Sequence, residues 1–175
     1  ECVALAKGKL SIDHLTLHGL WPNNRSCGID YGRCPGKPLQ LRQETIAFIQ
    51  PWMPNWYFGD DFGSYEWQKH GTCQSTWEDD DYFRIAVTAL KTINDASAGA
   101  YLRANIGGTI SRSVFWEKIN QDAGSDKAAD NVQLLCTGDA LYEIRVLLGP
   151  NFIAGQGMGP LLTGALDERI GKDAK

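Results

Sequence analysis

The sequence has only three histidines, and none of its five cysteines forms a C-x-x-C motif. The missing motif argues against thioredoxin-like redox chemistry and against zinc ribbons, which are built on closely spaced cysteine pairs. No apolar run approaches the roughly 18 residues that a membrane-spanning helix needs. No charged stretch followed by an apolar one opens the chain, so we interpret Glu1 and Cys2 as the start of a mature or trimmed segment.

The chain also lacks a large excess of either charge, and its net charge is -4. This value argues against a protein that holds long nucleic acids by counterion release, but it permits local binding of one or two nucleotides by a lysine. Apolar residues make up 43% of the chain and six tryptophans are present, which is enough for a core. A chain of this length fits one domain and buries roughly 70% of its unfolded surface.

The pattern of apolar residues predicts a single α+β domain over residues 1–175. Residues 11–20 alternate as a strand does, whereas residues 22–38 are rich in proline and glycine and predict a long loop. Helices are expected over 41–49, 65–77, 79–93 and 111–120, and an aromatic, irregular stretch over 52–64. Two paired strands are expected over 132–136 and 141–148, joined by Thr137-Gly138-Asp139. Residues 150–175 predict a divergent, loosely packed tail.

Two of the histidines lie inside short motifs, His18-Gly19-Leu20-Trp21-Pro22 and Tyr65-Glu66-Trp67-Gln68-Lys69-His70-Gly71-Thr72-Cys73. Two imidazoles can act as base and acid of one reaction, and a carboxylate and an ammonium beside them suit an anionic, phosphorane-like state. If residues 65–77 are helical, Glu66, Lys69 and His70 share one face about 5–6 Å apart. An ordinary Glu–Lys pair beside a solvated histidine gives the same spacing, but the second motif favours a functional site.

These two segments, in this order, resemble the active-site segments of the ribonuclease T2 family. The resemblance extends more loosely from Cys2 to about Leu148 and implies a central, mainly antiparallel sheet with several helices packed on it. It implies metal-independent cleavage of single-stranded RNA by attack of the ribose 2′-hydroxyl on phosphorus, giving 2′,3′-cyclic phosphate and then 3′-phosphate ends. By the same resemblance His70 is the base, His18 is the acid, and Glu66 and Lys69 stabilise the phosphorane. Opposed pKa shifts of the two histidines predict a mildly acidic optimum.

Tyr65 departs from the family pattern, in which many members have a histidine before the catalytic glutamate and some of bacterial type have tyrosine. A tyrosine can donate a hydrogen bond to phosphate but is uncharged at neutral pH, so we expect weaker phosphate binding. The resemblance implies that Trp21 and Asn23 bind one base. It implies a second base pocket of Pro54, Asn55 and Phe62. Base stacking tolerates any sequence, so low base specificity is expected, although core packing explains Trp21, Trp56 and Phe62 equally well.

The cysteines are assigned by the same resemblance, which implies a disulfide of Cys73 with Cys34 rather than with Cys27. Cys2, Cys27 and Cys136 are then one pair plus one unpaired cysteine, or three free thiols. Widely spaced cysteines in a small enzyme indicate an oxidising compartment, so we expect a secreted or periplasmic protein. The family's N-terminal strand and a late partner for Cys136 have no counterpart, so we expect a chain that is trimmed or divergent at both ends.

Two other functions compete with a ribonuclease. One is a binding protein on the same fold that has lost activity, which the complete set of catalytic residues disfavours. The other is a metal site of His70 and Cys73 with His14 or His18, which has few other donors nearby. We interpret His14 as structural. No cofactor or metal, no membrane, no obligate protein partner and a monomeric state are expected.

Overall fold

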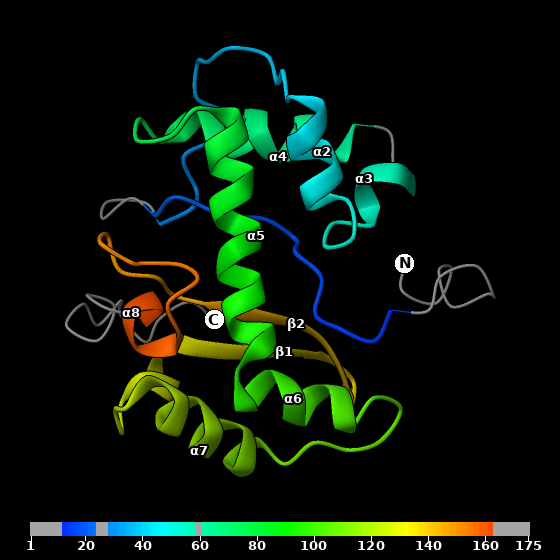
Figure 1. The fold of residues 1–175 in the computed structure, drawn as a ribbon, viewed down its shortest axis with the longest axis vertical. Coiled ribbons are helices and arrows are strands. Elements are labelled where there is room, and N and C mark those ends of the chain that lie inside the picture. Colours follow the sequence, from blue (N-terminus) through cyan, green and yellow to red (C-terminus); the bar gives the residue numbers. More distant parts are fainter. Residues whose placement is uncertain (1–11, 24–27, 59–60, 163–175) are drawn as a thin grey trace. The chain divides into compact units, whose positions relative to one another are not determined.

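A computed structural model of the chain describes residues 12–23, 28–58 and 61–162 (Figure 1). The chain forms two compact units. The motif unit is Thr16–Leu90, and the hairpin unit joins the residues up to Leu15 to those from Lys91 onward. The long helix α5 (Asp79–Asp95) contributes its first residues to the motif unit and its last ones to the hairpin unit. Within the described part of the chain, no helix is long and apolar enough to cross a membrane.

The motif unit is helical and closes around an aromatic core. Its other helices are α2 (Gln43–Ile49), α3 (Asn55–Phe58), α4 (Phe62–Lys69) and the 3-10 turn η1 (Gly71–Cys73). They gather around the N-terminal end of α5 (Figure 1). The core consists of Ile49, Met53, Trp67, Tyr82, Phe83 and Val87. Tyr82 stands edge-on to Trp67 at 5.5 Å and to Phe83 at 5.1 Å, a geometry that aromatic pairs favour.

The loop before α2 is held by a disulfide and by hydrogen bonds rather than by secondary structure. Cys34 is bonded to Cys73, and the Thr72 hydroxyl donates to the Cys34 carbonyl at 2.9 Å. At the other end of the loop, the Gln40 amide donates to Asp79 at 2.7 Å and the Arg42 guanidinium to Asp80 at 2.8 Å. The acidic first turn of α5 therefore fixes this segment as well as complementing the helix dipole.

The hairpin unit contains two packed helices and a two-stranded sheet. Helix α6 (Ser97–Ala104) packs on α7 (Arg112–Ala123), which also contacts η2 (Ala128–Asn131) and α8 (Met158–Leu162). Strands β1 (Val132–Thr137) and β2 (Ala140–Val146) are antiparallel, with an irregularity between Leu135 and Cys136. The turn between them needs glycine at Gly138, where φ is 58°.

Several sequence predictions are confirmed. The α+β class is correct, and the helices expected over 41–49, 79–93 and 111–120 correspond to α2, α5 and α7. The expected strand pair corresponds to β1 and β2. These segments share strong periodicity or a clear turn signal, which is why local pattern was enough to find them.

Other predictions are wrong. Residues 12–20, the described part of the strand expected over 11–20, form no strand. The amides of this segment bond elsewhere, Leu15 to the Asn94 side chain and Leu17 to the Trp52 carbonyl. The stretch over 52–64, expected to be irregular, contains α3 and the start of α4. Helix α6 was not predicted, because its small residues give only a weak helical pattern of apolar side chains.

The tail is also more ordered than expected. Instead of packing loosely, residues 158–162 form α8, whose Met158, Leu161 and Leu162 are buried. The prediction weighted the glycines of this segment and overlooked its apolar side chains. Residues 163–175 of the expected tail lie outside the described part of the chain.

Candidate active site

Helix α4 carries two of the four predicted catalytic residues, Glu66 and Lys69, and it ends sooner than predicted, just before a third, His70. It spans Phe62–Lys69 instead of residues 65–77, and His70 leaves the helix with φ -122° and ψ -52°. A side chain at Gly71 would lie 2.1 Å from the Trp67 ring, so the chain turns sharply here only because residue 71 is glycine. Glu66, Lys69 and His70 therefore do not share one regular helical face, and each has different surroundings.

Glu66 joins the two motifs. Its carboxylate is 1% exposed, accepts a hydrogen bond from Trp21 Nε1 at 2.9 Å and lies 3.8 Å from His18 Nε2. A Cβ on Gly19 would approach Glu66 Oε2 to 2.1 Å and Trp21 Nε1 to 2.7 Å. The glycine between His18 and Trp21 is thus required for the buried carboxylate to reach the indole.

The two motif histidines flank the same indole. Trp21 stands edge-on to His18 at 4.9 Å between ring centroids and stacks on His70 at 5.3 Å. Phe62 lies 5.8 Å from His18 between ring centroids. His18 is half exposed, whereas His70 is only 3% exposed. The structure therefore brings together two imidazoles that differ in access to solvent.

His70 is held in its neutral form by its surroundings. Burial lowers its pKa to about 4, with further lowering by the charge of Lys69 and by His18. Its Nδ1 lies 2.6 Å from the Tyr31 hydroxyl, and the Tyr31 ring is edge-on to the imidazole. A neutral imidazole at physiological pH is suited to accept a proton.

Lys69 supplies a cation beside Tyr65. Its ammonium donates to the Tyr65 hydroxyl at 2.9 Å, and this bond raises the pKa of Lys69. The Arg33 guanidinium lies 5.8 Å from the centroid of the same tyrosine ring. Positive charge therefore surrounds Tyr65, although the tyrosine itself is uncharged at neutral pH.

The residues predicted to bind bases are only partly brought together. Trp21 and Phe62 contact His18, and Tyr65 contacts Lys69. Asn23 is exposed, Pro54 is buried and Asn55 opens α3. Within the described residues these three make no hydrogen bond or ring contact with the predicted catalytic side chains. Trp56 packs edge-on against Phe83 at 5.3 Å, which is core packing.

Sequence reasoning missed two residues of this site, Tyr31 and Arg33. Both lie in the loop that has no regular structure, where periodicity carries no signal. Their proximity to Cys34 is the one sequence feature that could have indicated them, because the bridge to Cys73 brings this loop to the end of α4.

The disulfide between Cys34 and Cys73 confirms the predicted pairing, with the two Cα atoms 5.0 Å apart. Cys136 is exposed and forms no disulfide with another described residue, whereas Cys2 and Cys27 lie outside the described residues. Because its sulfur is in the bridge, Cys73 has no thiolate to offer to the metal site considered above. Across residues 12–23, 28–58 and 61–162, no group of three or more histidine, cysteine or acidic side chains could hold a metal.

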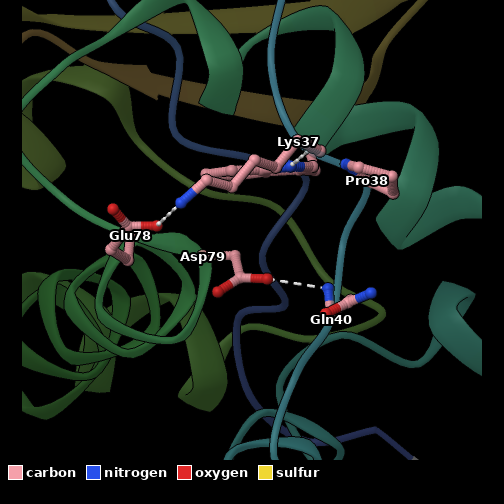
Figure 2. A pocket seen from close by; sticks show the side chains of 6 residues that line it. Lys37, Pro38, Gln40, Glu78 and Asp79 are labelled. Carbon is pink, nitrogen blue, oxygen red and sulfur yellow. Dashed lines mark hydrogen bonds and ion pairs between the residues drawn. The ribbon is translucent and has the colours of Figure 1, made fainter.

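A separate cavity of the motif unit has a structural explanation (Figure 2). Its lining residues are Lys37, Pro38, Gln40, Trp67, Glu78 and Asp79. Lys37 pairs with Glu78 at 3.7 Å, and Asp79 accepts from the Gln40 amide. Trp67 Nε1 donates to the Lys37 carbonyl at 2.8 Å. These groups satisfy one another and anchor the loop to α4 and α5.

The described residues form an α+β protein in which two imidazoles and a buried carboxylate contact one indole, and the ammonium of Lys69 follows on the same helix as the carboxylate. Comparison with known families agrees with this class. The profile of the Ribonuclease T2 family matches residues 1–156. The chain belongs to the ribonuclease T2 family.

Several curated relatives are similar to the chain. Ribonuclease I of Escherichia coli K12 is 28% identical over 168 residues, covering 81% of this chain and 62% of that protein. Ribonuclease T2 of Aspergillus oryzae is 37% identical over 83 residues, covering 40% and 29%. Extracellular ribonuclease LE of Solanum lycopersicum is 34% identical over 80 residues, covering 42% and 34%. The chain thus spans less than two thirds of the length of each of these relatives.

Proposed function

We propose that this protein is an endoribonuclease that cleaves single-stranded RNA without a metal ion. The observation that carries the proposal is the contact of both His18 and His70 with the Trp21 indole, beside the buried Glu66 carboxylate. Membership of the ribonuclease T2 family supports the same conclusion. Two imidazoles on either side of one reacting phosphate suit a transfer in which one group takes a proton and the other gives one.

His70 is the general base in this proposal. Its low pKa keeps it unprotonated, so it accepts the proton of the ribose 2′-hydroxyl as the 2′-oxygen attacks phosphorus. The bond from phosphorus to the 5′-oxygen of the next nucleotide breaks as the 2′,3′-cyclic phosphate forms. A water molecule then opens the cyclic ester to a 3′-phosphate with the acid and base roles reversed.

His18 is the general acid and protonates the departing 5′-oxygen. Its half-exposed position leaves it accessible to a bound chain, and Glu66 lies 3.8 Å from its Nε2 as a counterion for the imidazolium. Lys69 stabilises the negative charge that develops on the phosphorane oxygens. Arg33 adds a second positive charge beside Tyr65, whose hydroxyl already accepts a hydrogen bond from Lys69.

Base binding is proposed to rest on stacking, with Trp21 and Asn23 at one base and Pro54, Asn55 and Phe62 at the other. Such contacts read the face of a base rather than its edge, so little base specificity is expected. We propose that residues 1–175 act as one domain and as a monomer. Export to an oxidising compartment, secreted or periplasmic, is supported by the Cys34–Cys73 bridge and by a relative named as extracellular.

The test is product analysis of a defined oligoribonucleotide in EDTA between pH 4 and pH 8. We expect 2′,3′-cyclic phosphate ends from the wild type, formed about 10²- to 10⁴-fold more slowly by His18→Ala or His70→Ala. The matched control substrate carries a single 2′-deoxyribose at one position. We expect no cleavage after that nucleotide and normal cleavage at the others. Cleavage at that position, or loss of activity in EDTA, would contradict the two-histidine mechanism.

A further inference from the structure

Tyr31 contacts the imidazole of His70 on the side away from the expected chemistry at Nε2. Its hydroxyl lies 2.6 Å from Nδ1, and its ring is edge-on to the imidazole at 5.8 Å between centroids and 84° between planes. The Trp21 indole stacks on the imidazole face at 5.3 Å and 28°. The ring of His70 is therefore held by an aromatic face and by one hydrogen bond.

The disulfide explains how the Tyr31 hydroxyl is held next to His70. Tyr31 precedes Cys34 by three residues, and His70 precedes Cys73 by the same number. The bridge, with 5.0 Å between its Cα atoms, ties the two short segments together. The Cys73 amide also bonds to the His70 carbonyl at 2.9 Å, which fixes the turn after α4. Tyr31 is thereby delivered to His70 from a loop without regular secondary structure.

The position of the proton on a neutral imidazole decides what the ring can do. One ring nitrogen carries the hydrogen and the other offers a lone pair, and the hydrogen bond made by one nitrogen fixes the state of the other. If Nδ1–H donates to the Tyr31 oxygen, Nε2 has the lone pair. If the hydroxyl donates to Nδ1, Nε2 carries the hydrogen and cannot act as a base.

We propose that Tyr31 is a positioning residue whose hydroxyl oxygen accepts a hydrogen bond from His70 Nδ1–H and so keeps Nε2 ready to receive the proton of the 2′-hydroxyl. This inference rests on the proposed function of His70 as the base. When Nε2 takes the proton, the imidazolium keeps its Nδ1–H bond to Tyr31, which strengthens because the donor has become charged. Tyr31 forms no covalent bond and gives up no proton in this step.

Other charged groups act on the same imidazole. Lys69 and His18 oppose its protonation, and the Glu66 carboxylate is bonded to the Trp21 that stacks on it. Tyr82 donates to the Leu20 carbonyl in the same unit. Among these groups, Tyr31 has its hydroxyl within hydrogen-bond distance of the imidazole, so removing that oxygen removes the hydrogen bond to Nδ1.

The first experiment is ¹⁵N NMR of the histidine rings in the wild type and in Tyr31→Phe at pH 7, with His70→Gln used to assign the signals. Phenylalanine keeps the ring for packing or base stacking and removes only the hydroxyl. We expect Nδ1 of His70 to be protonated in the wild type and Nε2 to gain hydrogen occupancy in Tyr31→Phe. A wild-type His70 protonated at Nε2, or a tautomer unchanged by the substitution, would overturn the proposal.

The second experiment is the pH profile of RNA cleavage by the same variant. We expect kcat to fall about 10- to 100-fold with KM nearly unchanged, because the lost bond is strongest when the imidazole is charged. The acidic limb of kcat/KM should move to lower pH. Tyr142→Phe, an exposed tyrosine on β2, is the matched control and should change neither value.

The two experiments fail in distinguishable ways. An inactive wild type with the expected tautomer would remove the proposed ribonuclease function and leave the Tyr31–His70 contact standing as a structural one. An active Tyr31→Phe variant with wild-type kcat and an unmoved pH profile would overturn the positioning role and leave the ribonuclease function intact. If the Tyr31→Phe variant does not fold, the tautomer of His70 measured in the wild type still decides whether the proposal holds.

Discussion

The two histidine motifs place the same side chain in contrasting surroundings. His18 lies in a segment without regular structure, is half exposed and faces the Glu66 carboxylate. His70 lies at the end of α4, is almost fully buried, and has its pKa lowered to about 4. The difference teaches that environment rather than residue type separates the proposed acid from the proposed base.

The largest expected effect comes from removing either histidine. We expect His18→Ala and His70→Ala each to lower kcat about 10²- to 10⁴-fold, the range for one general acid or base. The double variant should be little worse than the singles, because the two groups act in one step. Initial rates on an oligoribonucleotide, with circular dichroism to verify folding, make the comparison. His14→Ala is the control and should keep full activity, since His14 lies outside the two motifs and its side chain contacts Asp13.

Removing the bridge should separate the two parts of the site without touching a catalytic side chain. We expect the double variant Cys34→Ala, Cys73→Ala to lose about 4 kcal/mol of the free energy of unfolding, from the chain-entropy cost of a loop this long. The sequence separation of the bridge is 39 residues. Urea denaturation measures the loss, with Cys136→Ala as the control. Equal midpoints for the two variants would show that the bridge contributes little.

The burial of His70 makes stability depend on pH. Because its folded pKa is below the unfolded value of 6.5, the unfolded state binds the proton first as the pH falls. The contribution of neutral His70 to the free energy of unfolding is therefore fully present above pH 6.5 and declines between pH 6.5 and about 4. It amounts to roughly 3 kcal/mol in total. Urea titrations across this window should show the slope in the wild type and a smaller one in His70→Gln. Parallel slopes would mean that His70 is not the group responsible.

The smallest expected effect comes from substituting Tyr65, which lies on α4 in the same motif as His70. Tyr65→His adds a positive charge at acidic pH beside Lys69, so we expect a lower KM at pH 5 and little change at pH 8. Tyr65→Phe is the matched control and should not lower KM at either pH. Steady-state kinetics on one oligoribonucleotide measure both variants, and an unchanged KM at pH 5 would argue against phosphate binding at this position.

The two sequence motifs singled out His18, Glu66, Lys69 and His70 as candidate catalytic residues. The structure brings three of them, His18, Glu66 and His70, into contact with Trp21, and the catalytic roles stay predictions. The end of α4 was mispredicted because Gly71 and the Cys73 bridge stop a helix that the local pattern would continue. The segment before Trp21 was mispredicted as a strand because alternation alone cannot show whether a partner strand exists.

By itself, the sequence determined which chemical groups are available: two imidazoles, one carboxylate, one ammonium and a pair of cysteines. Only the tertiary structure decided that the Gly19 backbone packs against the Glu66 carboxylate and that Tyr31 reaches Nδ1 of His70. The physical reason is that burial and hydrogen bonding depend on residues far apart in the chain, and these set which imidazole stays neutral.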